Sequence, residues 1–155
     1  MEGLLITPAQ VAELAFRAPD FISPDTIGEA TILATQQKFI APVFGGLYQR
    51  LCEGAYPDFT EEYVVAPLAL YVKMQMLPQL AVQAGGGGVV EVTSKNLARV
   101  GDAKLRLAVR RLRSDAAALI DRAIDHIEAS PEAFPEYDPR ENILNHTSID
   151  GGIIL

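Results

Sequence analysis

The pattern that most constrains this chain is a long stretch of helical periodicity from about Asp102 to Ala129. Apolar residues recur there every three or four positions, so they share one face of a helix. At about 1.5 Å per residue this helix would be roughly 40 Å long, about the width of a small domain. The pattern predicts a spine for packing and assembly. Its predicted buried face consists of Leu105, Val109, Leu112, Ala116, Leu119, Ala123 and Ile127.

Size and composition predict one folded domain. The chain has 155 residues, of which 49% are hydrophobic and 21% are charged, enough for one core and too few to expect two. The single cysteine, Cys52, cannot form an internal disulfide, which favours a reducing, cytoplasmic setting. The N-terminus lacks the features of a signal peptide, and the longest apolar run, Val64–Val72, is far shorter than the roughly 20 residues that span a bilayer. We therefore expect a soluble protein with no membrane partner.

Three cap-like signals predict where the earlier helices begin. Residues Thr7 to Gln10 have the elements of a capping box, with proline at the first helical position. Residues Ser23 to Asp25 repeat the cap-and-proline signal before a second helix. Residues Asp58 to Glu61 predict a third capping box. The predicted face of the second helix carries Ile27, Ala30, Thr31, Ala34 and Lys38.

The third signal opens an apolar segment that we interpret as the central core helix. The run Val64–Val72 is apolar on nearly all sides of a helix, as expected of a buried element. A buried strand is the alternative, but Pro67 argues against a central strand because proline cannot donate to a ladder. The sequence leaves open whether Pro42, Pro67 and Pro78 kink helices or end them.

Four consecutive glycines, Gly85, Gly86, Gly87 and Gly88, interrupt the helical pattern. Each glycine costs a helix about 1 kcal/mol relative to alanine, so we expect a mobile loop. The next residues, 89–93, are β-prone and predict a small β element. A phosphate-binding loop is not expected, because Lys and Ser or Thr do not follow the glycines and Glu91 would repel phosphate.

The net charge of −7 is unevenly distributed along the chain. Basic residues gather in the first half of the long helical pattern, and acidic residues dominate after Arg113. This order opposes the helix dipole, which favours cations at the C-terminal end, so something other than isolated helix stability sets it. The candidate interface residues are Lys104, Arg106, Arg110, Arg111 and Arg113.

Three interpretations of this basic stretch are open. Arg106, Arg110 and Arg113 share one helix face at i, i+4 and i+7, while Lys104 and Arg111 lie to one side. The stretch is a solvated face, a phosphate-binding face, or a surface that meets the acidic half of a neighbouring subunit in a head-to-tail assembly. It lacks interleaved aromatic residues and any known base-recognition motif, so we expect no sequence-specific nucleic-acid recognition.

The sequence offers no catalytic set, metal cluster or cofactor motif. His126 near Asp121 or Asp125 is the one arrangement that suits proton transfer, although a histidine among charges on a helix surface is usually solvated. Metal sites need three or four converging ligands, and no such spacing appears. Cys52 has no histidine close in sequence. We therefore expect neither enzymatic activity nor a bound cofactor.

The chain ends in a glycine pair followed by three apolar residues, Ile153, Ile154 and Leu155. Exposed apolar residues after such a hinge can add a strand to a sheet edge or fill a groove on a neighbour. The alternative is that they pack back onto their own core. We accordingly divide the chain into one helical domain, residues 1–145, and an apolar C-terminal tail, residues 146–155.

Several of these segments, in this order, resemble the head–tail connector (adaptor or neck) proteins of tailed bacteriophages and prophages. In those proteins a helix runs into an aromatic-Ile-x-Pro-x-x-Gly turn and a further helix follows. The similarity covers about residues 5–145. It is carried by Ile27–Tyr48 with the turn Phe39–Gly46, by Ala66–Tyr71, by the glycines that lead into Val89 and Val90, and by the long helix that ends in Phe134–Tyr137.

The resemblance implies a small, non-enzymatic helical protein that forms a ring beneath the phage portal. Such a ring extends the DNA channel and docks the next neck or tail protein, so the implied partners are further copies, portal and tail proteins, and DNA that passes without sequence-specific binding. An acidic surface would ease that passage, and the basic stretch would then face a neighbouring subunit.

We therefore predict an all-α helical bundle with one long C-terminal helix and a small β element near residues 89–93. Its predicted role is that of a head–tail connector in the cytoplasm of a bacterial host and in the virion. The alternative is a helical DNA- or nucleoprotein-binding module that uses the basic face of the long helix.

Overall fold

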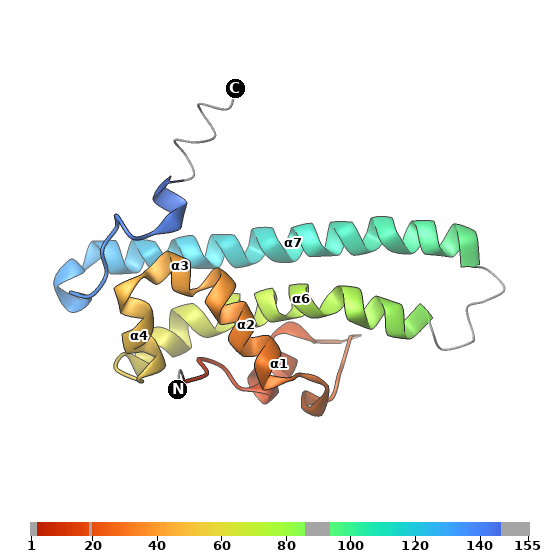
Figure 1. The fold of residues 1–155 in the computed structure, drawn as a ribbon, viewed down its shortest axis with the longest axis horizontal. Helices are drawn as coiled ribbons and strands as arrows, with labels where there is room; N and C mark the ends of the chain where they lie inside the picture. The colour runs from red at the N-terminus through yellow and green to blue at the C-terminus, as the bar shows by residue number, and fades with distance from the viewer. Residues whose placement is uncertain (1–2, 19, 86–93, 147–155) are drawn as a thin grey trace, which may run out of the picture.

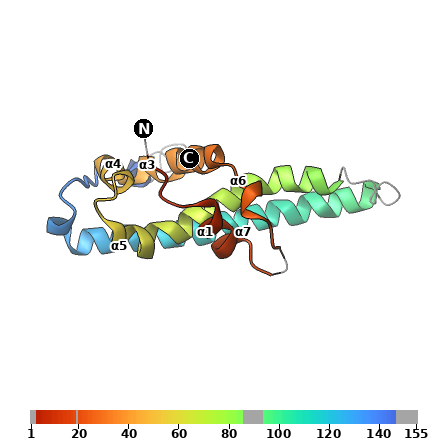
Figure 2. The same cartoon turned by 90° about the horizontal axis from the view of Figure 1, so that it is seen from below.

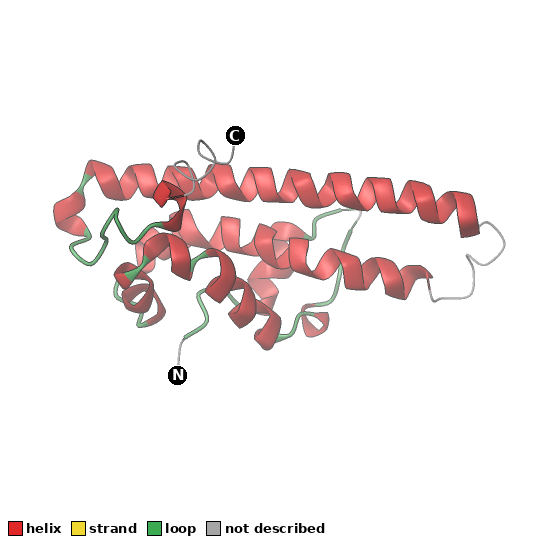
Figure 3. Ribbon diagram, turned by 45° about the horizontal axis from the view of Figure 1, so that its top comes forward, coloured by secondary structure: helices red, strands yellow, loops and turns green. Residues whose placement is uncertain are grey.

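The computed structural model describes residues 3–18, 20–85 and 94–146, and every regular element within them is a helix (Figure 3). The all-α prediction is confirmed for these residues, whereas the β element predicted at residues 89–93 lies outside them. The elements are α1 (Pro8–Ala15), the 3-10 turn η1 (Pro24–Thr26), α2 (Glu29–Phe39), α3 (Ala41–Phe44), α4 (Gly46–Cys52), α5 (Pro57–Phe59), the π-helical turn η2 (Thr60–Val64), α6 (Val65–Gly85), α7 (Ser94–Ala129) and the 3-10 turn η4 (Pro131–Ala133).

Helices α6 and α7 form a long hairpin around which the other elements are arranged (Figure 1). α7 has 36 residues, which corresponds to roughly 54 Å. The predicted start near Asp102 was too late, because the helix continues back to Ser94 through Gly101; one glycine costs a helix only about 1 kcal/mol. The shorter helices gather along one part of the hairpin, and its far end projects beyond them (Figures 1 and 2).

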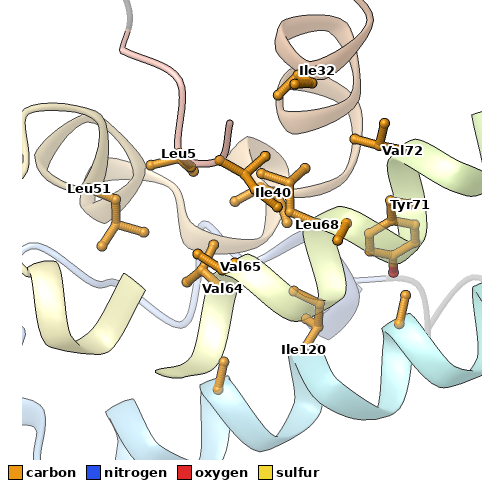
Figure 4. Close-up of a cluster of buried hydrophobic side chains, with 14 of the residues drawn as sticks. Leu5, Ile32, Ile40, Leu51, Val64, Val65, Leu68, Tyr71, Val72 and Ile120 are labelled. Atoms are coloured by element: carbon orange, nitrogen blue, oxygen red, sulfur yellow. The ribbon is translucent and has the colours of Figure 1, made fainter. Parts of the chain in front are cut away.

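α6 is the core helix, as predicted. It packs against α7, α1 and α2, and its side chains from Val65 to Val72 are mostly buried. Figure 4 shows side chains from the N-terminal segment, α2, α6 and α7 converging on one cluster that includes Leu68 and Ile120. The stretch Pro57–Ala81 is long and apolar enough to cross a membrane, but 50% of its apolar 18-residue window is buried inside the protein, as in a core helix.

The buried face of α7 follows the predicted periodicity. Ala116, Ala123 and Ile127 are buried, and the other predicted positions are half-buried. The pattern missed Ile120, which is 1% exposed and contacts the cluster around α6. The predicted face included the half-buried Leu119, the residue before Ile120.

Two of the three prolines lie within one helix, α6, and the third lies where α2 ends and α3 begins. Pro42 lies in the first turn of α3, directly after α2 ends at Phe39. Pro67 is near the start of α6, just after the π-helical turn η2, and Pro78 lies within α6. Proline lacks the N–H that α-helical pairing needs, and the π turn beside Pro67 is where the backbone pairing adjusts.

The capping box at Thr7 is confirmed. The Thr7 hydroxyl accepts from the Gln10 amide at 3.2 Å, and the Gln10 side chain accepts from the Thr7 amide at 2.9 Å. The predicted capping box at Asp58 was wrong: α5 begins at Pro57 after Tyr56, so Asp58 lies inside the first turn without a side-chain cap. Proline at the first helical position, rather than the acid after it, marks this start.

The second helix begins later than predicted and buries a different face. Ser23 caps only the 3-10 turn η1, and α2 starts at Glu29 after Gly28. The small and polar residues of the predicted face carry little apolar area, so they leave the core to other side chains. Of the predicted face, Ala30, Ala34 and Lys38 are exposed, Thr31 is half-buried, and Ile27 is buried but precedes α2. The buried residues of α2 are Ile32, Thr35 and Gln36.

Gln36 fastens the N-terminal segment to the bundle. Its side chain is fully buried, accepts from the Leu5 amide at 3.1 Å and donates to the Gly3 carbonyl at 3.0 Å and the Tyr48 hydroxyl at 3.0 Å. A buried amide side chain is stable only with such partners. The bonds hold Leu5 and its neighbour Ile6 in the core.

Candidate functional site

The outer surface of α7 carries the basic residues that the sequence singled out. All five are exposed, and within the part of the chain that the structure describes none of them pairs with a carboxylate. Arg106 makes only a local contact, from Nε to the Asp102 carbonyl at 3.4 Å. Unpaired exposed guanidinium groups are free to bind phosphates or carboxylates. The five are Lys104, Arg106, Arg110, Arg111 and Arg113.

Three of these side chains form what we call the basic face: Arg106, Arg110 and Arg113. The continuous helix confirms that they lie on neighbouring turns, with Lys104 and Arg111 turned to one side. Leu107, a large apolar side chain, lies beside them and is 49% exposed. Among the described residues, the shallow depression along this surface is lined by Ala103, Arg106, Leu107 and Arg110 of α7.

The second half of α7 carries a matching acidic face: Asp121, Asp125 and Glu128. These side chains are exposed, and none makes an ion pair among the described residues. One residue of each face, Arg113 and Asp121, lies near enough to Tyr71 of α6 to act on its phenol. Burial raises the pKa of the Tyr71 phenol, while Arg113 lowers it and Asp121 raises it.

His126 lies in an aromatic cluster. Its ring stacks on Tyr63 with centroids 4.4 Å apart and meets Phe134 edge-on at 5.8 Å. Arg122 covers the Tyr63 ring at 4.5 Å and reaches Glu62 at 3.5 Å. The described residues show no hydrogen bond from His126 to an aspartate, so the proton-transfer arrangement considered from the sequence does not form there.

No group of three metal-ligating side chains occurs among the described residues. Cys52 is half-buried near the amide of Gln36, with Nε2 and Sγ 3.9 Å apart. The surroundings of Cys52 are those of a packed helix end. The candidate site is accordingly a surface rather than a pocket.

Two glutamates that the sequence analysis did not single out fix the segment after α7 to α4 and to the residue before α5. Glu136 accepts from the Tyr56 hydroxyl at 2.6 Å and from Arg50 Nε at 3.3 Å. The hydrogen bond from the Tyr56 phenol is the main cause that holds the pKa of Glu136 below its ordinary value, and Arg50 contributes less. The same phenol bond raises the pKa of Tyr56. Glu141 accepts from the Gly46 amide at 2.9 Å, at the start of α4.

This same segment ends in an apolar surface. Ile143 is 48% exposed and Leu144 is 42% exposed. Together with Phe39, Pro42 and Ile120 they line a depression of about 150 Å³. In the sequence this surface is visible only as Ile143 and Leu144 between two asparagines. Such a pair does not by itself show whether its side chains are buried or exposed.

Two further predictions fall on parts of the chain outside the described residues. The glycine loop is described only at Gly85, the last residue of α6, and Gly86–Gly88 lie beyond it. The apolar tail with Ile153, Ile154 and Leu155 also lies outside the described residues, which end at His146. The division at residue 145 thus stays a prediction.

The model of a family of unknown function, DUF6712, matches residues 23–146, which include α2 to α7 and the segment that carries Glu136 and Glu141. No curated protein and no solved structure matches the chain.

Proposed function

The chain belongs to DUF6712, a family of unknown function, and we propose that it is a structural assembly protein of a tailed phage or prophage. In this proposal it is a head–tail connector: copies form a ring between portal and tail that extends the DNA channel. It performs no catalysis, holds no cofactor and works first in the host cytoplasm and then in the virion.

One observation carries the proposal: α7 presents charged faces that its own chain leaves without ion pairs among the described residues. A long helix with bare basic and acidic halves fits a protein whose partners complete its surface. The all-α fold and the turn at Gly45–Gly46, which is held by Glu141, are compatible with the connector resemblance. The net charge of −7 favours passage of DNA over its retention.

The test is assembly on a portal. The purified chain is mixed at moderate salt with the portal protein encoded in the same genome, and the complexes are imaged by electron microscopy. The expected result is an added ring of constant stoichiometry on one end of the portal. If saturating amounts of the chain add no density to the portal, the connector role is wrong.

The second candidate is a DNA- or nucleoprotein-binding module, and the bare basic face is the observation that favours it. Three to five phosphate contacts would make affinity for duplex DNA fall steeply with salt. Fluorescence anisotropy with a labelled duplex measures this directly. Tight binding that the substitution of Arg106, Arg110 and Arg113 abolishes would favour this candidate, and no binding of the monomeric chain at low salt would exclude it.

A further inference from the structure

We infer that free copies of this chain pair through α7, side by side and antiparallel, so that the basic face of each copy covers the acidic face of the other. The inference concerns the free chain and depends only on the layout of charges on α7. It therefore stands or falls separately from the connector role.

The two faces lie on the same side of one straight element. Within each face the residues are spaced i, i+4 and i+7, so each forms a stripe along the helix. Asp121 follows Arg106 by fifteen positions, a little more than four turns, which turns the acidic stripe by only about 60° from the basic one. A single partner helix can thus contact both.

The spacing sets the register of the pair. With the twofold axis opposite Ala117, each basic side chain of one copy meets an acidic side chain of the other, and the symmetry repeats every contact. The expected contacts are Arg106 with Glu128, Arg110 with Asp125, and Arg113 with Asp121 of the partner copy.

The centre of this contact allows close approach. Ser114, Ala117 and Ala118 are small and exposed. One side of Ala117 lines the depression with Ile143 and Leu144, so a second helix can pack on the side of Ser114 and Ala118, at about 8–10 Å between axes. Leu107 adds apolar area that the isolated chain leaves 49% exposed. The small residues and Leu107 supply packing, and the charges supply the register.

The antiparallel arrangement also relieves an unfavourable feature of α7 itself. Arg106 and Arg110, like Asp121 and Asp125, place equal charges at i and i+4, which repel each other on a single helix. In a parallel pair shifted by about four turns, the basic face of one copy would meet the acidic face of the other. The remaining acidic face of the first copy and basic face of the second would stay uncovered. The antiparallel pair covers all of them and opposes the two helix dipoles.

Because a twofold contact is complete with two copies, the pair does not grow into a filament. It covers the basic face, so the free chain is expected to hold DNA weakly. A neighbour in a ring would need the same surface, which means that the pair must open before a connector ring can form.

The first test is the mass of the free chain by analytical ultracentrifugation at low and moderate salt. We expect a dimer at low salt whose dissociation constant rises steeply as salt is added. The triple variant Arg106→Glu, Arg110→Glu, Arg113→Glu should raise that constant at least about tenfold. The control Lys104→Glu, Arg111→Glu reverses two charges beside the face instead of three within it and should change the dissociation constant no more than about twofold. A monomer at every concentration at low salt, or equal effects of the two variants, would overturn the inference.

The second test combines complementary variants. Asp121→Lys, Asp125→Lys, Glu128→Lys should also abolish pairing of the variant with itself, since two basic halves then meet. Mixed with the triple glutamate variant, it should form a one-to-one complex at low salt. Absence of that complex, with both variants folded by circular dichroism, contradicts the charge-paired contact.

The third test measures orientation, by electron paramagnetic resonance with spin labels on cysteines placed in a Cys52→Ala chain. Labels at Ala118 lie beside the twofold axis and should be close together, whereas labels at Ala103 should be separated by roughly 40 Å along the helices. A parallel, shifted pair would give similar distances at both sites, roughly 20 Å along the helices, and would refute the antiparallel arrangement.

Discussion

Replacing Gly45 with alanine tests how the turn between α3 and α4 is held. Gly45 has φ 54° and ψ −127°, a backbone conformation that residues with a side chain strongly avoid. A Cβ there would lie 2.9 Å from the Glu141 Cβ and closer still to its carboxylate. Alanine would therefore strain the backbone and push Glu141 away from the Gly46 amide, which it reaches at 2.9 Å.

The expected loss of stability follows from these two effects. Backbone strain of this kind costs about 1–3 kcal/mol, and a lost helix-start cap costs about 1 kcal/mol. We expect the Gly45→Ala substitution to lower the free energy of unfolding by about 3 kcal/mol. For a chain of this size that corresponds to a fall in Tm of roughly 10 °C. Urea and thermal unfolding followed by circular dichroism measure both quantities.

Two other glycines provide matched controls. Gly54 also has a positive φ, 77°, but a Cβ there would meet nothing within 4 Å, so Gly54→Ala should cost only about 1 kcal/mol. Gly101 lies within α7 with nothing near its Cβ position, and Gly101→Ala should stabilise the protein by about 0.5–1 kcal/mol. If Gly45→Ala costs no more than Gly54→Ala, or if removing the Glu141 side chain leaves its cost unchanged, the proposed clash does not exist.

Three further substitutions test other contacts. Tyr56→Phe removes the hydrogen bond that lowers the pKa of Glu136, so it should destabilise the protein at a pH above about 4.5. This loss of stability should vanish as the pH falls through the lowered pKa of Glu136. An equal fall in Tm at pH 7 and pH 3 in thermal unfolding would contradict this. Gln36→Leu should cost about 1–3 kcal/mol and speed amide exchange in the N-terminal segment, since that segment loses a buried acceptor; unchanged exchange would refute the tether. Ile120→Ala should cost about 2–5 kcal/mol in urea unfolding because the side chain is 1% exposed, and a cost below about 1 kcal/mol would place Ile120 outside the core.

The helical skeleton was predictable because its signals are local and repeated. The apolar spacing in α7 and the run Val64–Val72 each extend over several turns, so helix formation and burial follow from the sequence alone. The box at Thr7 is a complete local motif and forms as predicted. The face of α2 was not predictable in this way, because it depends on where α6 and the N-terminal segment lie, which Gln36 helps to set.

The contacts that hold the segment after α7 are non-local, and the sequence contains no sign of them. Glu136 and Glu141 look like any exposed acid until the fold brings them to Tyr56 and Gly46, many residues earlier in the chain. Part of the candidate site was predictable for the opposite reason. The basic face is a property of helix spacing alone, so its exposed residues could be named without the fold, whereas the aromatic surroundings of His126 required it.

The order of charges along α7 is more informative about partners than about folding. An unfavourable arrangement relative to the dipole costs only about 0.3–1 kcal/mol per charge and acts mainly in the end turns, whereas packing of α7 against α6 buries several large side chains. The fold therefore tolerates almost any charge order on the outer surface of α7. Two stripes of equal length and opposite sign, spaced to oppose each other around Ala117, have no role in that packing. An antiparallel copy on this surface pairs every charge of both stripes, so the partner that best explains the pattern in the free chain is the chain itself.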